Sequence, residues 1–475
     1  MQAWIASALL TLSLLAQAPD RTAPPPLGPT PTLRVPPVVT RTLSNGLPVW
    51  VVERHKVPVV AVSLVVRSGS AADPPGKEGI GSLTAAMLDE GAGGRDALAI
   101  ADGIDYLGAS LGTTSAFDSS AVRLEVPVAR LDEALPIMAD VSLRPAFPRR
   151  ELDRIRQERL TALLQSRDDP ASIVAVAFPR LIYPPGHRYG VPAAGTAETI
   201  RAIALEDLTR FYTAHYRPDN AALLVVGDVA ADTMLPRLER AFGGWRAAAG
   251  PRPTTPVQGA PQLTARQVYL IDKPGAAQSQ ISIGWIGVPR STPDYFPLTV
   301  LNTILGGSFT SRLNQNLRED KGYTYGARSA FDMRAAAGPF LAAAGVQTDK
   351  TADALREFFR ELERIHEPVP GEELAKARNY VALAYPSEFE TAGAVLQQLE
   401  ERVVYNLPED YFSSYIPNVQ AVTAADVQRA AKQHIRANQM AVVVVGDAKA
   451  VEGPIRALNL GPMRLVPLDD VLGAP

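Results

Sequence analysis

The chain repeats itself at one fixed interval, and this repeat limits its possible folds more than any other feature of its 475 residues. Two apolar stretches of the first half, VWVVER and LLVVGD, return 219 residues later as VYLIDK and VVVVGD. An aspartate that opens a helix and a histidine that follows it return at the same offset, as the pairs Asp207/Asp426 and His215/His434. Four matches in one register indicate a tandem duplication. The two halves should therefore share one fold.

Each half contains the same mixture of strands and helices. In the first half, two stretches rich in β-branched residues, LPVWVVER and VPVVAVSLVVRSG, predict a pair of strands. Later stretches such as LEDLTRFYTAHY place apolar residues at helical spacing, and an apolar strand ending in Gly-Asp closes the half. The sequence therefore predicts an α+β fold of two homologous domains in tandem, each a largely antiparallel sheet with helices packed on one face.

Composition sets the predicted domain boundaries. The stretch from Pro19 to Thr40 holds eight prolines, and the stretch from Arg246 to Ala265 is rich in Pro, Gly and Ala, so both should be connectors. The predicted segments are a signal peptide (1–18), a Pro-rich tether (19–40), a first domain (41–245), a linker (246–265) and a second domain (266–475).

The first 18 residues have the pattern of a secretory signal peptide. The stretch WIASALLTLSLLAQA is apolar, ends in an A-x-A pattern and is too short for a comfortable membrane span. No Lys or Arg precedes it, so a buried N-terminal helix is the alternative. We expect a periplasmic or secreted protein with no membrane span in the mature chain.

Charge and cysteine content exclude several classes of protein. A net charge of −3 without long runs of like charge disfavours a nucleic-acid-binding protein and a polybasic membrane patch. The absence of cysteine excludes disulfides and thiolate metal ligands.

Four stretches carry a resemblance to the M16 family, which includes insulinase, pitrilysin and the mitochondrial processing peptidase. The match spans Arg41 to about Gly446 and is similar to the shorter bacterial two-domain form. The stretches are LSNGLPVWVVERHKVPVVAVSLVVRSGSAADPPGKEGIGSL, HRYGVPAAGT, FYTAHYRPDNAALLVVGD and ILGGSFTSRLNQNLREDKGYTYGARS. The loop that begins with HRYG should serve packing rather than chemistry.

The resemblance implies that active members carry H-x-x-E-H on the first helix, with two zinc-binding histidines and a general-base glutamate. These positions fall on Ser82, Ala85 and Ala86, which supply neither imidazole nor carboxylate. The family's third ligand, a glutamate on a later helix, should fall near Thr161 to Leu163, where RLTALLQSR contains no acid. We therefore expect no metal or other cofactor on this chain, and zinc on a partner chain.

The five histidines are too scattered to suggest a replacement site. No two of them lie closer than 28 residues in the sequence. A site assembled from distant histidines is disfavoured, because a catalytic zinc needs three protein ligands around one point. Histidines on loops and helix surfaces are the favoured interpretation.

The second half contains an Arg and a Tyr seven residues apart, Arg318 and Tyr325. In the family, such a pair reaches across to the zinc site, holds the substrate backbone and stabilises the oxyanion, so the resemblance implies catalytic roles for both residues. The stretch FTSRLNQNLRED predicts a helix with Phe309 on its apolar face and Gly322 at its end, and YTYGARSAF predicts a strand. The alternative is that Arg318 is a solvated charge at a helix end and Tyr325 a half-buried strand residue.

These observations predict a zinc-free subunit of an M16-type metalloendopeptidase, inactive by itself. It would supply Arg318 and Tyr325 to a homologous partner that carries H-x-x-E-H, and the two chains would enclose a chamber for unfolded peptide. The alternative is a non-enzymatic peptide-binding or structural protein on the same scaffold. Activity of this chain alone as a zinc peptidase is disfavoured by the missing ligands.

The signal-peptide interpretation predicts that the exported protein begins near Pro19. N-terminal sequencing of the periplasmic or secreted protein should show the loss of roughly the first 18 residues. Retention of Met1 in a cytoplasmic fraction would refute the interpretation.

Overall fold

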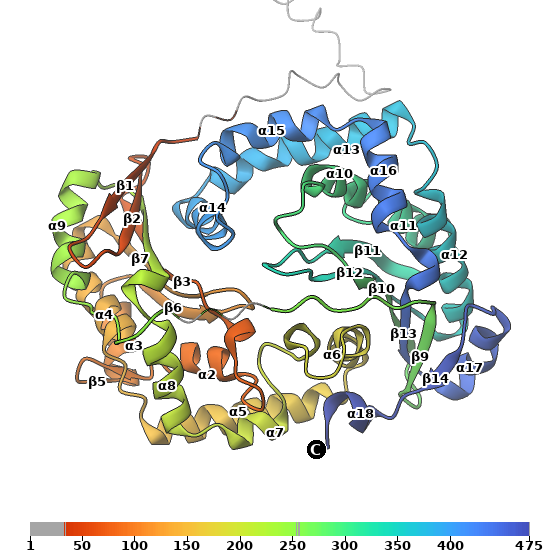
Figure 1. The fold of residues 1–475 in the computed structure, drawn as a ribbon, viewed down its shortest axis with the longest axis horizontal. Helices are drawn as coiled ribbons and strands as arrows, with labels where there is room; N and C mark the ends of the chain where they lie inside the picture. Colours follow the sequence, from red (N-terminus) through yellow and green to blue (C-terminus); the bar gives the residue numbers. More distant parts are fainter. Residues whose placement is uncertain (1–32, 34, 253, 255–256, 475) are drawn as a thin grey trace, which may run out of the picture. The chain divides into compact units, whose positions relative to one another are not determined.

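Two six-stranded sheets, which share the order of five strands, organise the described part of the chain (Figure 1). The computed structural model describes residues 33, 35–252, 254 and 257–474. The predicted signal peptide and most of the predicted tether therefore lie outside the described residues. Residues from Leu33 onward form one compact unit.

The first sheet has the strand order β1-β2-β8-β3-β7-β6. All neighbouring strands pair antiparallel except β2 and β8, which are parallel. The strands are β1 (Val38–Thr42), β2 (Pro48–Glu53), β8 (Ala221–Gly227), β3 (Val59–Val66), β7 (Ser120–Pro127) and β6 (Ser110–Ser115). The edge strand β1 includes the last three residues of the predicted tether.

The second sheet has the order β11-β12-β10-β13-β9-β14, and its first five strands repeat the order β6-β7-β3-β8-β2 of the first sheet. The sixth strands differ, because β1 precedes the repeated strands in the sequence and β14 follows them. Here β9 pairs in parallel with β13 and β14, and the remaining neighbours are antiparallel. The strands are β11 (Thr324–Phe331), β12 (Pro339–Gln347), β10 (Gln278–Ile286), β13 (Ala441–Gly446), β9 (Gln267–Asp272) and β14 (Met463–Leu465). The shared order confirms the predicted α+β duplication.

Helices cover one face of each sheet, as predicted, and apolar residues such as Leu208 and Phe211 fill the space between the layers. The first half contributes α2 (Ile80–Ala86), α3 (Ala97–Tyr106), α4 (Leu131–Leu143), α5 (Arg149–Ser166), α7 (Ala197–Ala202), α8 (Leu205–His215) and α9 (Ala231–Phe242). The second half contributes α10 (Tyr295–Leu305), α11 (Arg312–Asn314), α12 (Thr351–Arg364), α13 (Gly371–Ala384), α15 (Tyr411–Ala421), α16 (Ala424–His434) and α17 (Ala448–Ala457). No helix in the described ranges is long and apolar enough to cross a membrane.

The opposite face of each sheet is covered by one helix from the other half, which the sequence did not predict. Helix α6 (Pro170–Ile182) of the first half packs on β10 and β13, and α14 (Ala392–Val404) of the second half packs on β3 and β8 (Figure 1). Strands β8 and β13 are consequently buried on both faces. This double burial explains why LLVV and VVVV are continuous apolar runs and not alternating ones.

The contact of α6 with the second sheet depends on close packing. Phe178 of α6 reaches β10 at Gly284. A Cβ atom at Gly284 would lie 1.9 Å from the Phe340 carbonyl oxygen and 3.0 Å from the Phe178 ring. Since neither approach is sterically possible without movement, only glycine fits at this position.

The contact of α14 with the first sheet includes a buried charge. The Glu400 carboxylate accepts hydrogen bonds from Ser63 Oγ of β3 and from Arg123 Nε of β7, both at 2.7 Å, and a second guanidinium nitrogen also donates to it. A buried carboxylate without partners is strongly unfavourable. This network therefore specifies which side of α14 faces the sheet.

Removal of this carboxylate should destabilise the protein. Glu400→Ala leaves Ser63 and Arg123 without their acceptor, and we expect a loss of about 2 kcal/mol in the free energy of unfolding. The loss should be smaller than for a fully buried pair because the Arg123 side chain is partly exposed. Urea denaturation followed by circular dichroism measures this loss.

Glu409→Ala, at an exposed position, is the control and should change stability by less than about 0.5 kcal/mol. Equal losses in the two variants would contradict the assignment.

Candidate functional site

A buried carboxylate fixes the start of α2, the helix that carries the predicted motif positions. Asp73 accepts hydrogen bonds from the backbone N–H groups of Gly79 (2.6 Å) and Gly81 (3.0 Å), and Arg188 Nη2 donates to it at 2.7 Å. Burial raises the pKa of Asp73 to about 6, although Arg188 and the backbone donors act in the opposite direction. Because Arg188 belongs to the HRYG loop, that loop anchors α2 by packing and hydrogen bonding.

The side chains of α2 supply no metal ligand at the predicted motif positions. Ser82 and Ala86 are half-buried one helical turn apart, and Ala85 is buried. A methyl group has no lone pair to donate, and a neutral hydroxyl is a poor ligand for zinc, which prefers imidazole, thiolate and carboxylate. The helix is present, but its donor atoms do not fit the metal.

A guanidinium group lies at the junction of α2 and α5, a feature that the sequence analysis missed. Arg159 Nη2 of α5 donates to the Ser82 carbonyl at 3.0 Å, and Nη1 is buried without a hydrogen-bond partner among the described residues. Burial lowers the pKa of Arg159, but an arginine side chain stays protonated in proteins. Leu163, in the predicted range of the third ligand, follows one turn later on α5. A fixed positive charge beside Ser82 opposes a metal cation, so this junction does not fit zinc.

The histidines lie apart and have local partners. His215 is buried with Nδ1 at 3.1 Å from Ser68 Oγ, and burial lowers its pKa to about 4. The prediction of a surface position is wrong for His215, because the last turn of α8 faces the core. The other contacts join His55 to Asp228, His187 to the Gln258 carbonyl, His366 to the Ile435 carbonyl and His434 to Asp294. The described residues contain no group of three or more His, Asp or Glu side chains that could hold a metal.

Arg318 lies in a π-helical turn of the second half. The turn spans Gln315–Asp320 and continues α11, and turns of this kind occur frequently at functional sites. Gly322, with a φ of 66°, donates its N–H to the Arg318 carbonyl at 3.1 Å and ends the helical segment as predicted. Arg318 Nε lies 3.4 Å from the Glu319 carboxylate.

Phe309 holds the Arg318 side chain. The predicted position of Phe309 on the apolar face of the helix is wrong, because the helix begins at Arg312 and Phe309 precedes it with 60% of its surface exposed. Leu313 and Leu317 are the residues of this stretch that reach the core. The Arg318 guanidinium carbon lies 4.5 Å from the centre of the Phe309 ring, which is a cation–π distance. Phe309 is therefore a positioning residue for Arg318.

Tyr325 points into solvent from the edge strand β11. Its exposed fraction is 89%, so the alternative of a half-buried strand residue is wrong. The pairing of β11 with β12 is interrupted between Thr324 and Ala327, and such bulges redirect side chains. The Ala327 N–H donates to Asn314 Oδ1 at 3.1 Å, which ties the strand to α11.

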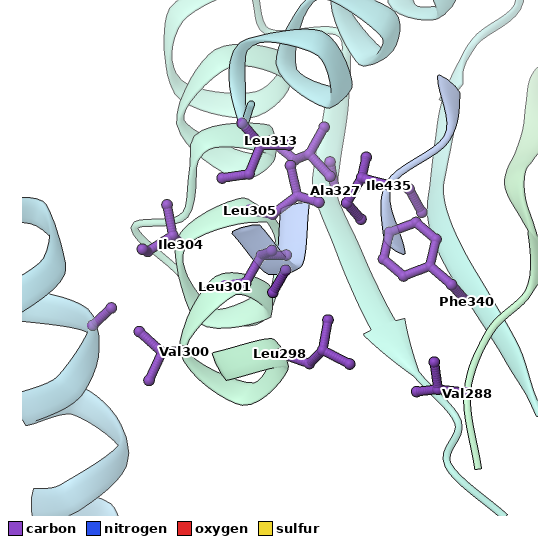
Figure 2. Close-up of a cluster of buried hydrophobic side chains, with 14 of the residues drawn as sticks. Val288, Leu298, Val300, Leu301, Ile304, Leu305, Leu313, Ala327, Phe340 and Ile435 are labelled. Carbon is purple, nitrogen blue, oxygen red and sulfur yellow. The ribbon is translucent and has the colours of Figure 1, made fainter. Parts of the chain in front are cut away.

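One apolar cluster supports the backbone beneath both residues. Figure 2 shows Leu305 of α10, Leu313 of α11 and Ala327 of β11 in this cluster, together with Phe340 of β12. All four side chains are buried. Packed elements of this kind hold exposed side chains more precisely than loops do.

Arg318 and Tyr325 are not connected to the motif helix within this chain. Helix α2 contacts β6, β7 and α8 of the first half, and the π-helical turn contacts α11, α12 and β11 of the second half. Within the described ranges, no hydrogen bond or ion pair joins Arg318 or Tyr325 to α2. The guanidinium and phenol groups can therefore donate to a ligand from outside this chain.

Two family descriptions match the chain. "Insulinase (Peptidase family M16)" matches residues 49–175, and "Peptidase M16 inactive domain" matches residues 202–381.

Similar proteins come from bacteria and from a eukaryote. An "uncharacterized zinc protease" of Rickettsia bellii is 26% identical over 373 residues, which is 77% of this chain and 85% of the relative. The crystal structure of a peptidase M16 inactive domain from Pseudomonas fluorescens has a TM-score of 0.80 and 27% identity, and the match covers 86% of this chain and 98% of that chain. A chain of complex III2 from Candida albicans shares the fold at 18% identity, with a TM-score of 0.73 over 90% of this chain and 100% of that chain. The repeated fold and these matches together show that this chain belongs to the M16 peptidase family.

Proposed function

We propose that this chain is the zinc-free subunit of an M16-type metalloendopeptidase. The observation that carries the proposal is the half-buried Arg318 and the exposed Tyr325 above one packed apolar cluster, in a chain whose motif helix offers only Ser82, Ala85 and Ala86. A homologous partner bearing H-x-x-E-H would hold the zinc. This chain would supply hydrogen-bond donors to the substrate.

The chemistry of the two side chains suits that role. A guanidinium group presents a rigid fork of donors to peptide carbonyl oxygens. A phenol hydroxyl donates a hydrogen bond to the negative charge that develops on a carbonyl oxygen during attack. Tyr325, at 89% exposure, contributes little to packing, so its position is better explained by a contact with another molecule than by stability.

We also propose where the subunit is located and which class of substrate it binds. The predicted signal peptide supports a periplasmic or secreted subunit, and the names of the relatives support peptides or unfolded polypeptides as substrates. The alternative is a non-enzymatic scaffold. The fold shared with a chain of complex III2 supports this alternative. Activity measurements with a partner separate the two.

Because Ser82, Ala85 and Ala86 offer no good zinc ligand, we expect the purified chain to contain no stoichiometric zinc. Adding the ligands by Ser82→His, Ala85→Glu, Ala86→His and Leu163→Glu should still not give tight binding, because Arg159 leaves a positive charge at the junction. Further addition of Arg159→Met should raise the zinc content that remains after dialysis, measured by plasma mass spectrometry.

The control for this experiment is Arg150→Met in the same fourfold variant, because Arg150 is exposed at the start of α5. It should leave the zinc content unchanged. One tightly held zinc per wild-type chain would contradict the proposal. Equal zinc content with and without Arg159→Met would remove the role of Arg159.

Tyr325→Phe should leave folding and pairing intact, because only a hydroxyl is removed. Turnover of the complex with the H-x-x-E-H partner should fall by about 10²–10³-fold, as for the loss of an oxyanion donor. Arg318→Ala should also raise KM, because the guanidinium binds the substrate before reaction. Size exclusion verifies the complex, and cleavage of a quenched peptide measures turnover.

Tyr380→Phe is the matched control, since Tyr380 is a 52% exposed tyrosine on a different element, α13. It should keep full activity. Full activity in a stable Tyr325→Phe complex would leave this chain as a scaffold. A loss of activity that follows a loss of thermal stability would assign Tyr325 a structural role.

A further inference from the structure

A pocket of about 330 Å³ lies among α5, α6, α7 and the last helix α18 (Leu468–Leu472). Its apolar wall includes Leu160, Leu163 and Leu164 of α5 and Leu472 of α18. Leu164 is 56% exposed, so part of this wall faces solvent. The volume is at the lower end of the range for ligand sites and suits one or two residues better than a long peptide.

Three arginines and no acidic residue line this pocket among the residues that the structure describes. Arg167 pairs with Asp469 and donates to the Gly473 carbonyl at 2.7 Å, so it holds the C-terminal helix in place. Arg180 donates to a backbone carbonyl of the same helix at 3.2 Å. No described carboxylate lies within ion-pair distance of Arg180 or Arg201. Within the part of the chain that the structure describes, the exposed guanidinium groups of Arg180 and Arg201 thus lie beside an apolar wall without an ion-pair partner.

A wider pocket of about 750 Å³ adjoins the smaller one and shares Arg180, Arg201 and Leu472 with it. Its lining includes the carboxylates of Glu78 and Glu198 and is therefore mixed in charge.

We propose that the smaller pocket binds the apolar C-terminal residue of a peptide through its free carboxylate. The carboxylate matches the guanidinium groups of Arg180 and Arg201, because arginine binds carboxylates through paired, charge-assisted hydrogen bonds. The apolar side chain matches the leucine wall, and the small volume matches a chain end. The inference rests on the proposed function, which makes peptides the substrates. Leu163 lines this pocket, so the peptide end would bind beside the position predicted for the third zinc ligand.

Binding to the full chain tests the inference without a partner subunit. In isothermal titration calorimetry, N-acetyl-Ala-Ala-Leu with a free carboxylate should bind at least about tenfold more tightly than the corresponding amide. The double variant Arg180→Gln/Arg201→Gln should lose that preference. Arg150→Gln, exposed on α5 outside the pocket, should keep it. Circular dichroism verifies that each variant is folded.

Equal binding of the acid and the amide, no binding of either, or an unchanged preference in the double variant would overturn the inference. Tighter binding of octanoate than of the peptide acid would also overturn it, in favour of a fatty-acid site. Leu164→Asp should weaken binding of the acid, since it places a negative charge on the wall. This test measures binding to the chain alone, whereas the proposed function is tested by turnover of the complex, so failure of the one is distinguishable from failure of the other.

Discussion

Both faces of the central strands of each sheet must be removed from water, and the exchange of α6 and α14 between the halves meets that requirement. The central strands β8 and β13 are apolar on both sides, so a single layer of helices would leave half of their surface exposed. Each half supplies the missing cover for the other. The hydrogen bond between Ser63 and Glu400 joins positions 337 residues apart, which shows how far the exchange reaches along the chain.

This architecture explains how a motif helix persists without metal ligands. The buried face of α2 packs on its neighbours, and Asp73 holds its first turn independently of any metal. The motif positions Ser82 and Ala86 lie on the half-buried side, where small residues do not disturb the core. The core contacts of α2 therefore do not depend on the side chains of Ser82 and Ala86. In the second half, Arg318 is half-buried and Tyr325 is exposed, and both lie outside the apolar core.

The duplication, the fold class and the end of the helical segment at Gly322 could be predicted, because each rests on short-range patterns or on direct repetition. The helix exchange could not be predicted, because an apolar helix has the same pattern whichever sheet it covers. The direction of Arg159 depends on how α5 packs on α2, and the burial of His215 depends on which side of α8 meets the core. The spacing of Phe309 from Leu313 and Leu317 fits a helix, whereas the helix begins only at Arg312.

The exchange of α6 and α14 also affects how the protein is made. The first sheet is complete when β8 has been synthesised, but α14 follows only after most of the second half. During that interval an apolar sheet face remains uncovered on the nascent chain, and surfaces of this kind aggregate or bind chaperones. A cut in the linker would leave the first sheet without α14 and the second sheet without α6, because each fragment carries the helix that covers the other sheet. Each half therefore depends on the other to bury both faces of its own central strands.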